Sequence, residues 1–235
     1  LAERAGIPKG VFNIIVSDRA SEVGTEMATN PAVRKLGFTG STGVGKLLMQ
    51  QAAGTVKKVS LELGGNAPLI IFDDADLDRA VEGAIACKYR NAGQTCVCTN
   101  RIFVQDGVYD AFTERFARAV GEMKQGNGFA DGVTVGPMIT MAAVEKVEAH
   151  VADAVGQGAQ VVSGGARSNL GGLFYQPTIL TEATPKMRIF KEETFGPVAP
   201  LFRFQDEEDV IAIGADRRIN DTWSPILALM RSTMA

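Results

Sequence analysis

The chain has 235 residues, of which 46% are apolar and 22% are charged, and its net charge is −3. This composition is typical of a globular protein and allows one large α/β domain or two smaller ones, while the slight acidic excess disfavours nucleic acid as a partner. Three cysteines, without the second Cys or His pair that zinc requires, disfavour a disulfide framework and a metal site. We therefore expect a reducing, cytoplasmic location, without metal and without a membrane span.

The hydrophobic pattern predicts alternating strands and helices along most of the chain. Strands are expected at 11–16, 33–38, 56–63, 68–72, 102–105, 159–163 and 175–181. Helices are expected at 21–30 with Ser21 as N-cap, through 47–52, and at 77–89, 108–123 and 141–155. The alternation over residues 11–63 implies parallel βαβ units, and the glycine pair at 64–65, which interrupts the pattern, indicates a domain boundary near Gly65.

Both ends of the chain differ from this pattern. The sequence opens without Met, and its first residues resemble the last turn of a helix that ends at Gly6 and Pro8, so we expect the chain to begin within a longer protein. Beyond Ile213 the hydrophobic period is lost, and residues 214–235 are expected to form a divergent tail.

A loop rich in small residues, Gly40-Ser-Thr-Gly-Val-Gly-Lys46, follows a predicted strand and precedes a predicted helix. Its spacing is close to that of a P-loop, but Leu47 stands where the Ser or Thr that binds Mg²⁺ belongs, which argues against nucleotide hydrolysis. Backbone N–H groups at the start of a helix can still bind a phosphate. A tight turn without a ligand is the alternative.

Three cysteines and one histidine are the candidates for nucleophilic chemistry. Cys96 and Cys98 lie in a glycine-rich loop after a helix, where Gly93 lets the backbone come close to a ligand, so both are candidate thiolate nucleophiles. Cys87 lies within the helix and is interpreted as a packing residue. His150 is expected on the solvated face of its helix, which leaves a Cys-His catalytic pair with little support.

Glu62 stands at the end of a predicted strand, between two leucines and before Gly64 and Gly65. Such a glutamate is often an outward-facing strand residue, but a bend into a cleft would make it a general base. On the helix at 77–89, the apolar stripe predicts that Lys88 faces away from the core.

Four segments resemble the successive signatures of the NAD(P)-dependent aldehyde dehydrogenase family and occur in that family's order. They are Phe-Thr-Gly-Ser-Thr-Gly-Val-Gly at 38–45, Glu-Leu-Gly-Gly-Asn at 62–66, Asn-Ala-Gly-Gln-Thr-Cys at 91–96 and Glu-Glu-Thr-Phe-Gly-Pro-Val at 192–198. The resemblance implies part of that family's α/β fold: the C-terminal part of a Rossmann-type NAD(P)-binding domain at 1–65 and most of a catalytic domain at 66–213. The run from Lys88 to Cys98 is most similar to the succinate-semialdehyde dehydrogenase branch.

The resemblance also implies roles for individual residues. Cys96 would add to the carbonyl of a small aldehyde to give a thiohemiacetal, whose hydride passes to NAD or NADP and leaves a thioester. Glu62 would activate the water that hydrolyses this thioester, and Arg90 would bind the far carboxylate of a semialdehyde. The cofactor would contact Gly40 and Ser41 at its pyrophosphate, the Leu63 backbone at its carboxamide, and Glu193 with Phe195 at the nicotinamide ribose and ring.

The resemblance is incomplete in two respects. The family's earlier segment, with the oxyanion-hole Asn and the Lys that binds the adenosine ribose, would lie before Leu1, so the sequence does not separate NAD from NADP. The family's C-terminal strands and oligomerisation arm are also missing, although the complete enzyme is expected to be a homo-oligomer. The alternative function is an inactive chain that binds a nucleotide or a partner without catalysis.

Cys98 is a candidate for a reversible disulfide with Cys96; the alternative is that Cys98 only packs.

Overall fold

The computed structural model describes residues 1–214 and 228–230, and the chain divides into two compact units, Leu1–Leu63 and Gly64–Ala235. We call them unit 1 and unit 2 and describe each by itself. The divergent tail predicted at 214–235 falls outside the described residues, apart from Gly214 and residues 228–230. None of the helices in the described ranges combines the length and the apolar character that crossing a bilayer requires.

Unit 1 is built around two parallel strands and two α-helices. After a short 3-10 helix at Glu3–Ala5, its elements are α1 (Ala20–Thr29), β1 (Lys35–Gly40), α2 (Thr42–Ala53) and β2 (Lys58–Leu63). The two strands pair in register from Lys35 opposite Lys58 to Gly40 opposite Leu63, so their carboxyl ends lie side by side. A small core of Ala28, Leu36 and Leu48 joins the helices to this sheet.

Residues 11–16 are not the buried strand that their apolar composition predicts. The segment has no regular secondary structure, and its five apolar side chains are between 65% and 92% exposed. A strand needs a neighbour for its backbone hydrogen bonds, and within the described residues β1 and β2 pair only with each other. The next helix begins at Ala20 with Arg19 as its N-cap, so Ser21 lies in the first turn and the prediction that it caps the helix is wrong.

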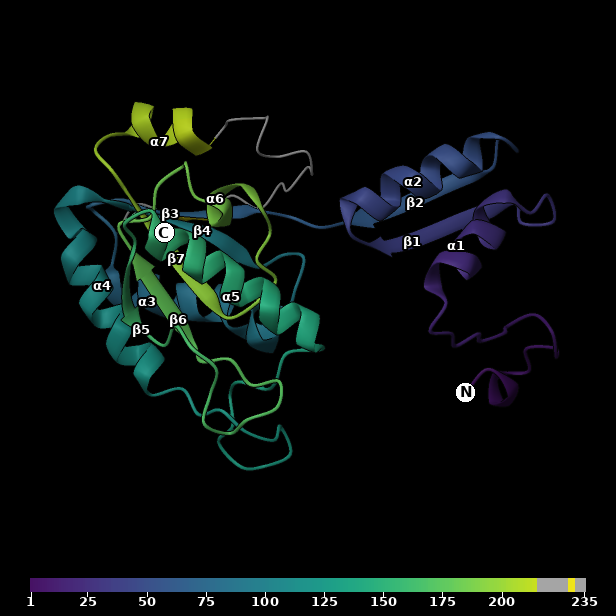
Figure 1. Cartoon of the computed structure of the whole chain (residues 1–235), viewed down its shortest axis with the longest axis horizontal. Coiled ribbons are helices and arrows are strands. Elements are labelled where there is room, and N and C mark those ends of the chain that lie inside the picture. The colour runs from purple at the N-terminus through teal and green to yellow at the C-terminus, as the bar shows by residue number, and fades with distance from the viewer. Residues whose placement is uncertain (215–227, 231–235) are drawn as a thin grey trace. The chain divides into compact units, whose positions relative to one another are not determined.

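The described residues of unit 2 form a six-stranded sheet with helices on both faces (Figure 1). Its strand order is β5-β6-β7-β4-β3-β8, and the pairs are parallel except for β5 with β6. Its strands are β3 (Ala67–Ile71), β4 (Thr99–Gln105), β5 (Gln160–Ser163), β6 (Thr178–Thr181), β7 (Val198–Phe204) and β8 (Ala228–Met230). Its helices are α3 (Leu77–Lys88), the 3-10 helix η2 (Arg90–Gly93), α4 (Asp106–Gly121), α5 (Met141–Gly156), α6 (Arg188–Lys191) and α7 (Glu207–Gly214).

The pair β5 and β6 is antiparallel, unlike the other strand pairs of this sheet. Residues 164–177, which connect these two strands, contain turns and no helix, and a parallel crossover needs an element that carries the chain back along the sheet. The sequence also predicts no element for α6, β7 or α7. Pro200 lies inside β7, opposite Leu180 of β6, and a proline in a central strand lowers the strand signal of its neighbours.

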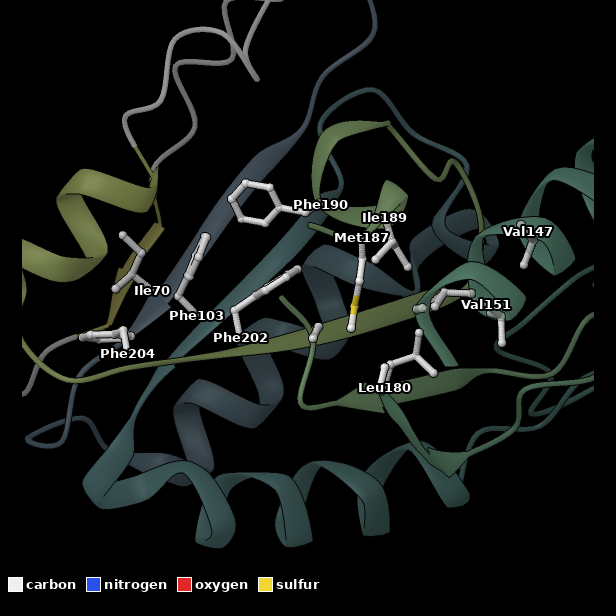
Figure 2. Close-up of a cluster of buried hydrophobic side chains, with 14 of the residues drawn as sticks. Ile70, Phe103, Val147, Val151, Leu180, Met187, Ile189, Phe190, Phe202 and Phe204 are labelled. Atoms are coloured by element: carbon white, nitrogen blue, oxygen red, sulfur yellow. The ribbon is translucent and has the colours of Figure 1, made fainter. Parts of the chain in front are cut away.

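Alternate residues of the central strands enter two different cores, which explains their continuous apolar runs. Leu69 and Ile71 of β3 pack with α3 and α4, whereas Ile70 packs with α5 and α6 on the opposite face. Figure 2 shows the second core, in which Phe103, Phe190 and Phe202 lie close together. Ring centroids there are 5.1 to 6.3 Å apart. The aromatic contacts anchor α6, and with it the start of the segment at 192–198.

Candidate active site

The predicted cofactor residues of unit 1 lie at the carboxyl ends of its two strands. Gly40 ends β1 and pairs with Leu63, which ends β2, so the structure brings these two together. Ser41 follows as the N-cap of α2, and its Oγ accepts a hydrogen bond of 3.4 Å from the N–H of Val44. Other N–H groups of the first helical turn have no intrahelical acceptor, which suits this end of α2 to a phosphate.

Close packing requires two of the loop glycines. A Cβ atom on Gly40 would overlap the ring of Phe38, and one on Gly45 would overlap the side chain of Leu63. The Phe38 ring and the Leu63 side chain fill these two spaces, so the two glycines serve packing within unit 1. A phosphate-binding turn at 40–45 is supported by the N–H groups at the start of α2.

Glu62 is the second-last residue of β2 and pairs with Thr39 of β1. Its side chain is exposed, in the alternation that β2 shows along its length. Glu62 belongs to unit 1 and Cys96 to unit 2. Each predicted catalytic group is therefore described within its own unit.

Cys96 lies in a tight turn between η2 and β4 in unit 2. The N–H of Cys98 donates a 3.0 Å hydrogen bond to the carbonyl of Thr95, which places Cys96 and Val97 at the corner of the turn. The Cys96 thiol is exposed, whereas Cys98 is buried and Cys87 is partly buried in α3. Of the three cysteines, Cys96 has the access that a nucleophile needs.

The backbone just before this turn is strained. Asn91 and Ala92 have φ values of 53° and 54°, in the left-handed region, and Gly93 continues at 71°. Each non-glycine residue in this region costs ~1–2 kcal/mol, so its surroundings must hold it there. A Cβ on Gly93 would overlap the carbonyl of Gly196, which means that Gly93 makes room for another part of the chain. The expectation that Gly93 makes room for a ligand is therefore corrected.

The side chain of Gln94 ties this strained loop to residues 137–139 by hydrogen bonds. Its Nε2 donates to the carbonyls of Asn91 and Pro137, at 3.1 and 3.2 Å, and its Oε1 accepts from the N–H of Ile139 at 2.9 Å. Asn91 returns a hydrogen bond of 3.0 Å to the carbonyl of Gln94. These bonds fix the direction in which the chain enters the Cys96 turn.

Cys98 is held in place by two contacts. Its Sγ lies 2.7 Å from Oγ1 of Thr95 and donates to the carbonyl of Lys88 at 3.7 Å. Lys88 ends α3, and Thr95 opens the turn that carries Cys96. Cys98 therefore packs the base of the turn, and its role in a disulfide stays a prediction.

Arg90 begins η2, six positions before Cys96 in the same loop, and its side chain is exposed. An exposed guanidinium can bind a carboxylate through two parallel hydrogen bonds. Its role in binding a substrate stays a prediction.

Glu193 and Phe195 lie between α6 and β7. Glu193 is half-buried, its Oε1 accepts a 3.2 Å hydrogen bond from the N–H of Gly65, and burial raises its pKa. A Cβ on Gly64 would overlap Oε2 of Glu193, so the glycine pair that follows β2 makes room for this carboxylate. Phe195 has a φ of 51°, in the same left-handed region of backbone angles as Asn91 and Ala92.

A buried lysine connects these loops, and its predicted outward orientation is wrong. Lys88 is fully buried, and its Nζ donates to Oδ1 of Asn100 at 3.2 Å. Nδ2 of Asn100 donates in turn to the carbonyl of Gly65 at 3.2 Å. Burial lowers the pKa of Lys88 to about 8, although the nearby Cys98 and Glu193 oppose this shift.

His150 is buried, which corrects its prediction as a solvated residue. It shares the inner face of α5 with Val147 and Val151, and the chain after α6 covers it. Its Nε2 lies 3.1 Å from Oε2 of Glu192, and its Nδ1 lies 3.2 Å from Oγ1 of Thr194. Burial lowers the pKa of His150 below 6.5.

A sequence profile described as "Aldehyde dehydrogenase family" matches residues 1–220. The chain belongs to the aldehyde dehydrogenase family. Among its relatives, the succinate-semialdehyde dehydrogenase GabD of Escherichia coli is 60% identical over 92% of this chain and 45% of that protein. The glutarate-semialdehyde dehydrogenase of Pseudomonas aeruginosa is 61% identical over 92% of this chain and 44% of that protein. A 3-sulfolactaldehyde dehydrogenase of Pseudomonas putida is 59% identical over 91% of this chain and 44% of that protein.

Solved structures agree with this membership. The crystal structure of succinate-semialdehyde dehydrogenase from Burkholderia pseudomallei has a TM-score of 0.92 and 52% identity, over all of this chain and 52% of that one. This similarity confirms that the chain has part of the aldehyde dehydrogenase fold, as the sequence predicts. The chain spans about half the length of the curated relatives it matches.

Motif reasoning in this aldehyde dehydrogenase chain did not identify the side chains that hold its loops. They are Lys88, Gln94, Asn100, Lys146, His150 and Glu192. Gln94 lies within the Asn-Ala-Gly-Gln-Thr-Cys motif and Glu192 within the last motif, so proximity to a signature is the one signal the sequence offered for them. Among the described residues, no group of three or more His, Cys, Asp or Glu side chains is arranged to hold a metal ion.

Proposed function

We propose that the chain provides the catalytic thiol and part of the cofactor site of an NAD- or NADP-dependent aldehyde dehydrogenase. The observation that carries this proposal is the exposed Cys96 thiol, at the corner of a turn that follows a strained and clamped loop. In this proposal residues 1–65 belong to the cofactor-binding domain and residues 66–213 to the catalytic domain. The alternative of an inactive binding chain is not favoured, because the relatives described above are all named as dehydrogenases.

The residues of each unit fit a dinucleotide cofactor. In unit 1, the start of α2 capped by Ser41 suits a pyrophosphate, and Gly40 and Leu63 lie beside it at the ends of β1 and β2. In unit 2, the carboxylate of Glu193 suits the ribose hydroxyls, and Phe195 suits the nicotinamide ring. When bound, NAD or NADP supplies the acceptor for the hydride.

The proposed chemistry of the protein's own groups follows from these positions. The Cys96 thiolate forms a bond from sulfur to the aldehyde carbon, which then loses a hydride and becomes a thioester carbon. Glu62 takes a proton from water, the hydroxide attacks the thioester, and the bond from carbon to sulfur breaks to release the carboxylate and the free thiolate. The expected cytoplasmic location and homo-oligomeric assembly stay predictions.

The proposed substrate is succinate semialdehyde or a similar small aldehyde with an anionic group. The substrates in the names of the relatives described above each carry a carboxylate or a sulfonate besides the aldehyde. Arg90 would bind this anionic group from the loop that also carries Cys96. The activity is testable in a chimera in which residues 1–213 of this chain replace the matching segment of Escherichia coli GabD.

In this chimera, Arg90→Ala is expected to raise the KM for succinate semialdehyde roughly tenfold to a hundredfold, because a charge-assisted hydrogen bond contributes about 1.5–3 kcal/mol. The KM for butanal, an uncharged aldehyde of similar size, should change less than about twofold. Arg79→Ala, which removes an exposed arginine of α3, is the control and should change neither value. If Arg90→Ala raised the KM of both substrates equally, Arg90 would not be the residue that binds the carboxylate.

Mild oxidation with peroxide is expected to link Cys96 to Cys98 in the same chimera, with loss of activity that a reductant restores. Two thiols lose two electrons and two protons to peroxide, and two residues separated by one in an irregular turn can reach disulfide geometry. Peptide mapping by mass spectrometry measures the linkage. If activity is lost and restored equally in Cys98→Ala, or if no linkage between the two forms, Cys98 is a packing residue.

A further inference from the structure

One face of α5 carries three polar side chains that contact the segment after β6. Nζ of Lys146 donates to the carbonyl of Glu193 at 2.6 Å, and Oδ2 of Asp153 accepts from the N–H of Arg188 at 2.8 Å. His150 lies between them and contacts two side chains of the same segment. Residues spaced by four and three positions lie along one stripe of an α-helix, so the three contacts form a row beside residues 188–194.

The hydrogen bonds of His150 are consistent with a neutral imidazole. Arg188 donates to Glu192 at 3.0 and 3.1 Å and lowers the pKa of its carboxyl group, so Glu192 is ionised and can only accept. Nε2 of His150 therefore carries the proton and donates to Glu192. Nδ1 then accepts from the hydroxyl of Thr194, so both ring nitrogens have a partner from the segment.

The segment that His150 holds leads directly to the loop of Cys96. A Cβ on Gly196 would overlap Cγ2 of Val147 in α5, and the carbonyl of Gly196 occupies the space beside Gly93. Residues 192–196 are thus packed between α5 and the strained loop at 91–93. A shift of this segment would move both Glu193 and the support of the Cys96 turn.

We propose that His150 is a positioning residue that fixes residues 192–196 by bridging Glu192 and Thr194, and through Gly196 supports the loop that carries Cys96. The importance of this for the cofactor rests on the proposed function, because Glu193 and Phe195 are cofactor contacts only in that proposal. The bridge itself depends on neither cofactor nor substrate. Its test can therefore succeed or fail independently of dehydrogenase activity.

The test is hydrogen exchange of the 235-residue chain, measured by mass spectrometry on peptides that cover residues 188–198 and 88–98. His150→Leu removes both hydrogen bonds, and we expect amides in 192–196 to exchange about tenfold faster, with a smaller increase in the peptide of the Cys96 loop. His150→Gln can donate to Glu192 and accept from Thr194, so it should stay within about threefold of the parent. A result for His150→Gln equal to that for His150→Leu would mean that the imidazole only fills space.

A matched control comes from the same helix. Glu148 of α5 pairs with Arg167 through two hydrogen bonds of 2.7 and 2.8 Å, so in the described structure its carboxylate is bound outside residues 188–196. Glu148→Gln should leave the exchange of 192–196 unchanged. Should His150→Leu fail to fold, Thr194→Val removes only the hydroxyl of the bridge and is expected to speed exchange in 192–196 by about threefold to fivefold. No increase in that variant would overturn the proposal.

The titration of His150 gives a second readout of the bridge, because a protonated Nδ1 can no longer accept from the hydroxyl of Thr194. The charged groups that face His150 are Glu192 and Arg188 from the covering segment and Lys146 from α5. Because burial lowers the pKa of His150, its contribution to stability is present above pH 6.5 and is lost as the pH falls toward the lower folded-state pKa. Protection of 192–196, corrected for intrinsic exchange rates, should therefore fall between pH 7 and pH 5 in the parent and stay flat in His150→Gln. A flat profile in the parent would contradict the bridge.

Discussion

Cys96→Ala is expected to abolish aldehyde oxidation in the chimera with GabD, with a fall in kcat of about 10⁴-fold or more. The thiolate forms the covalent bond on which every later step depends, and alanine offers no replacement nucleophile. Steady-state formation of NADPH measures this loss. Binding of the cofactor, measured by titration, should stay within about twofold because the thiol takes part only in the covalent step.

Cys87→Ala provides the matched control for this prediction. Cys87 is partly buried within α3, and its removal should leave turnover within about twofold of the parent. Both variants lose one thiol, so a difference in turnover between them must come from the position of the cysteine. Turnover of Cys96→Ala within tenfold of the parent would remove Cys96 from its proposed role.

The sequence predicted elements well where a local pattern decides the structure. The central strands of unit 2 are apolar on both faces, since Leu69 and Ile70 enter different cores, and such runs are visible without any knowledge of the fold. The helix at 77–88 begins where Asp76 accepts hydrogen bonds from two N–H groups of its first turn. Both signals lie within a few residues of the element that they define.

Predictions failed where the partner of a residue lies far along the chain. The apolar stripe of its helix predicts solvent for Lys88, and a mid-helix position predicts it for His150, but Asn100 binds the first and Glu192 and Thr194 cover the second. Residues 11–16 show the opposite error, because their apolar run forms a buried strand only if a neighbouring strand is available. Periodicity describes the preference of a segment, and contacts between distant segments decide whether that preference is satisfied.

Some residues of the candidate site could likewise be predicted from the sequence, and others could not. The motifs located Cys96 and Glu193 by their residue types and order, since each stands inside a signature. The strain at Asn91 and the clamp made by Gln94 depend on backbone angles and on distant carbonyls, which residue types do not encode. The chemical groups of the site were thus readable from the sequence, but the groups that hold them in place required the fold.

Glu62→Gln is expected to slow turnover of the chimera by about 10²–10⁴-fold while the covalent step survives. Glutamine has the shape of the glutamate but cannot take a proton from water, so hydrolysis of the thioester becomes the slow step. Rapid mixing should then give a burst of about one NADPH per active site, followed by slow turnover. Mass spectrometry of the quenched protein should find the acyl group on Cys96.

The burst separates a general base from a residue that only supports the fold. Glu82→Gln changes an exposed glutamate of α3 in the same way and should leave both the burst and the steady state unchanged. A structural role for Glu62 would lower the burst and the steady rate together, because fewer sites would be competent. Since Glu62 is exposed at the end of β2, its replacement by an isosteric amide removes no buried contact, and a slow rate with a full burst can only reflect the lost proton acceptor. Loss of the burst, or hydrolysis at the parental rate, would therefore assign the activation of water to another group.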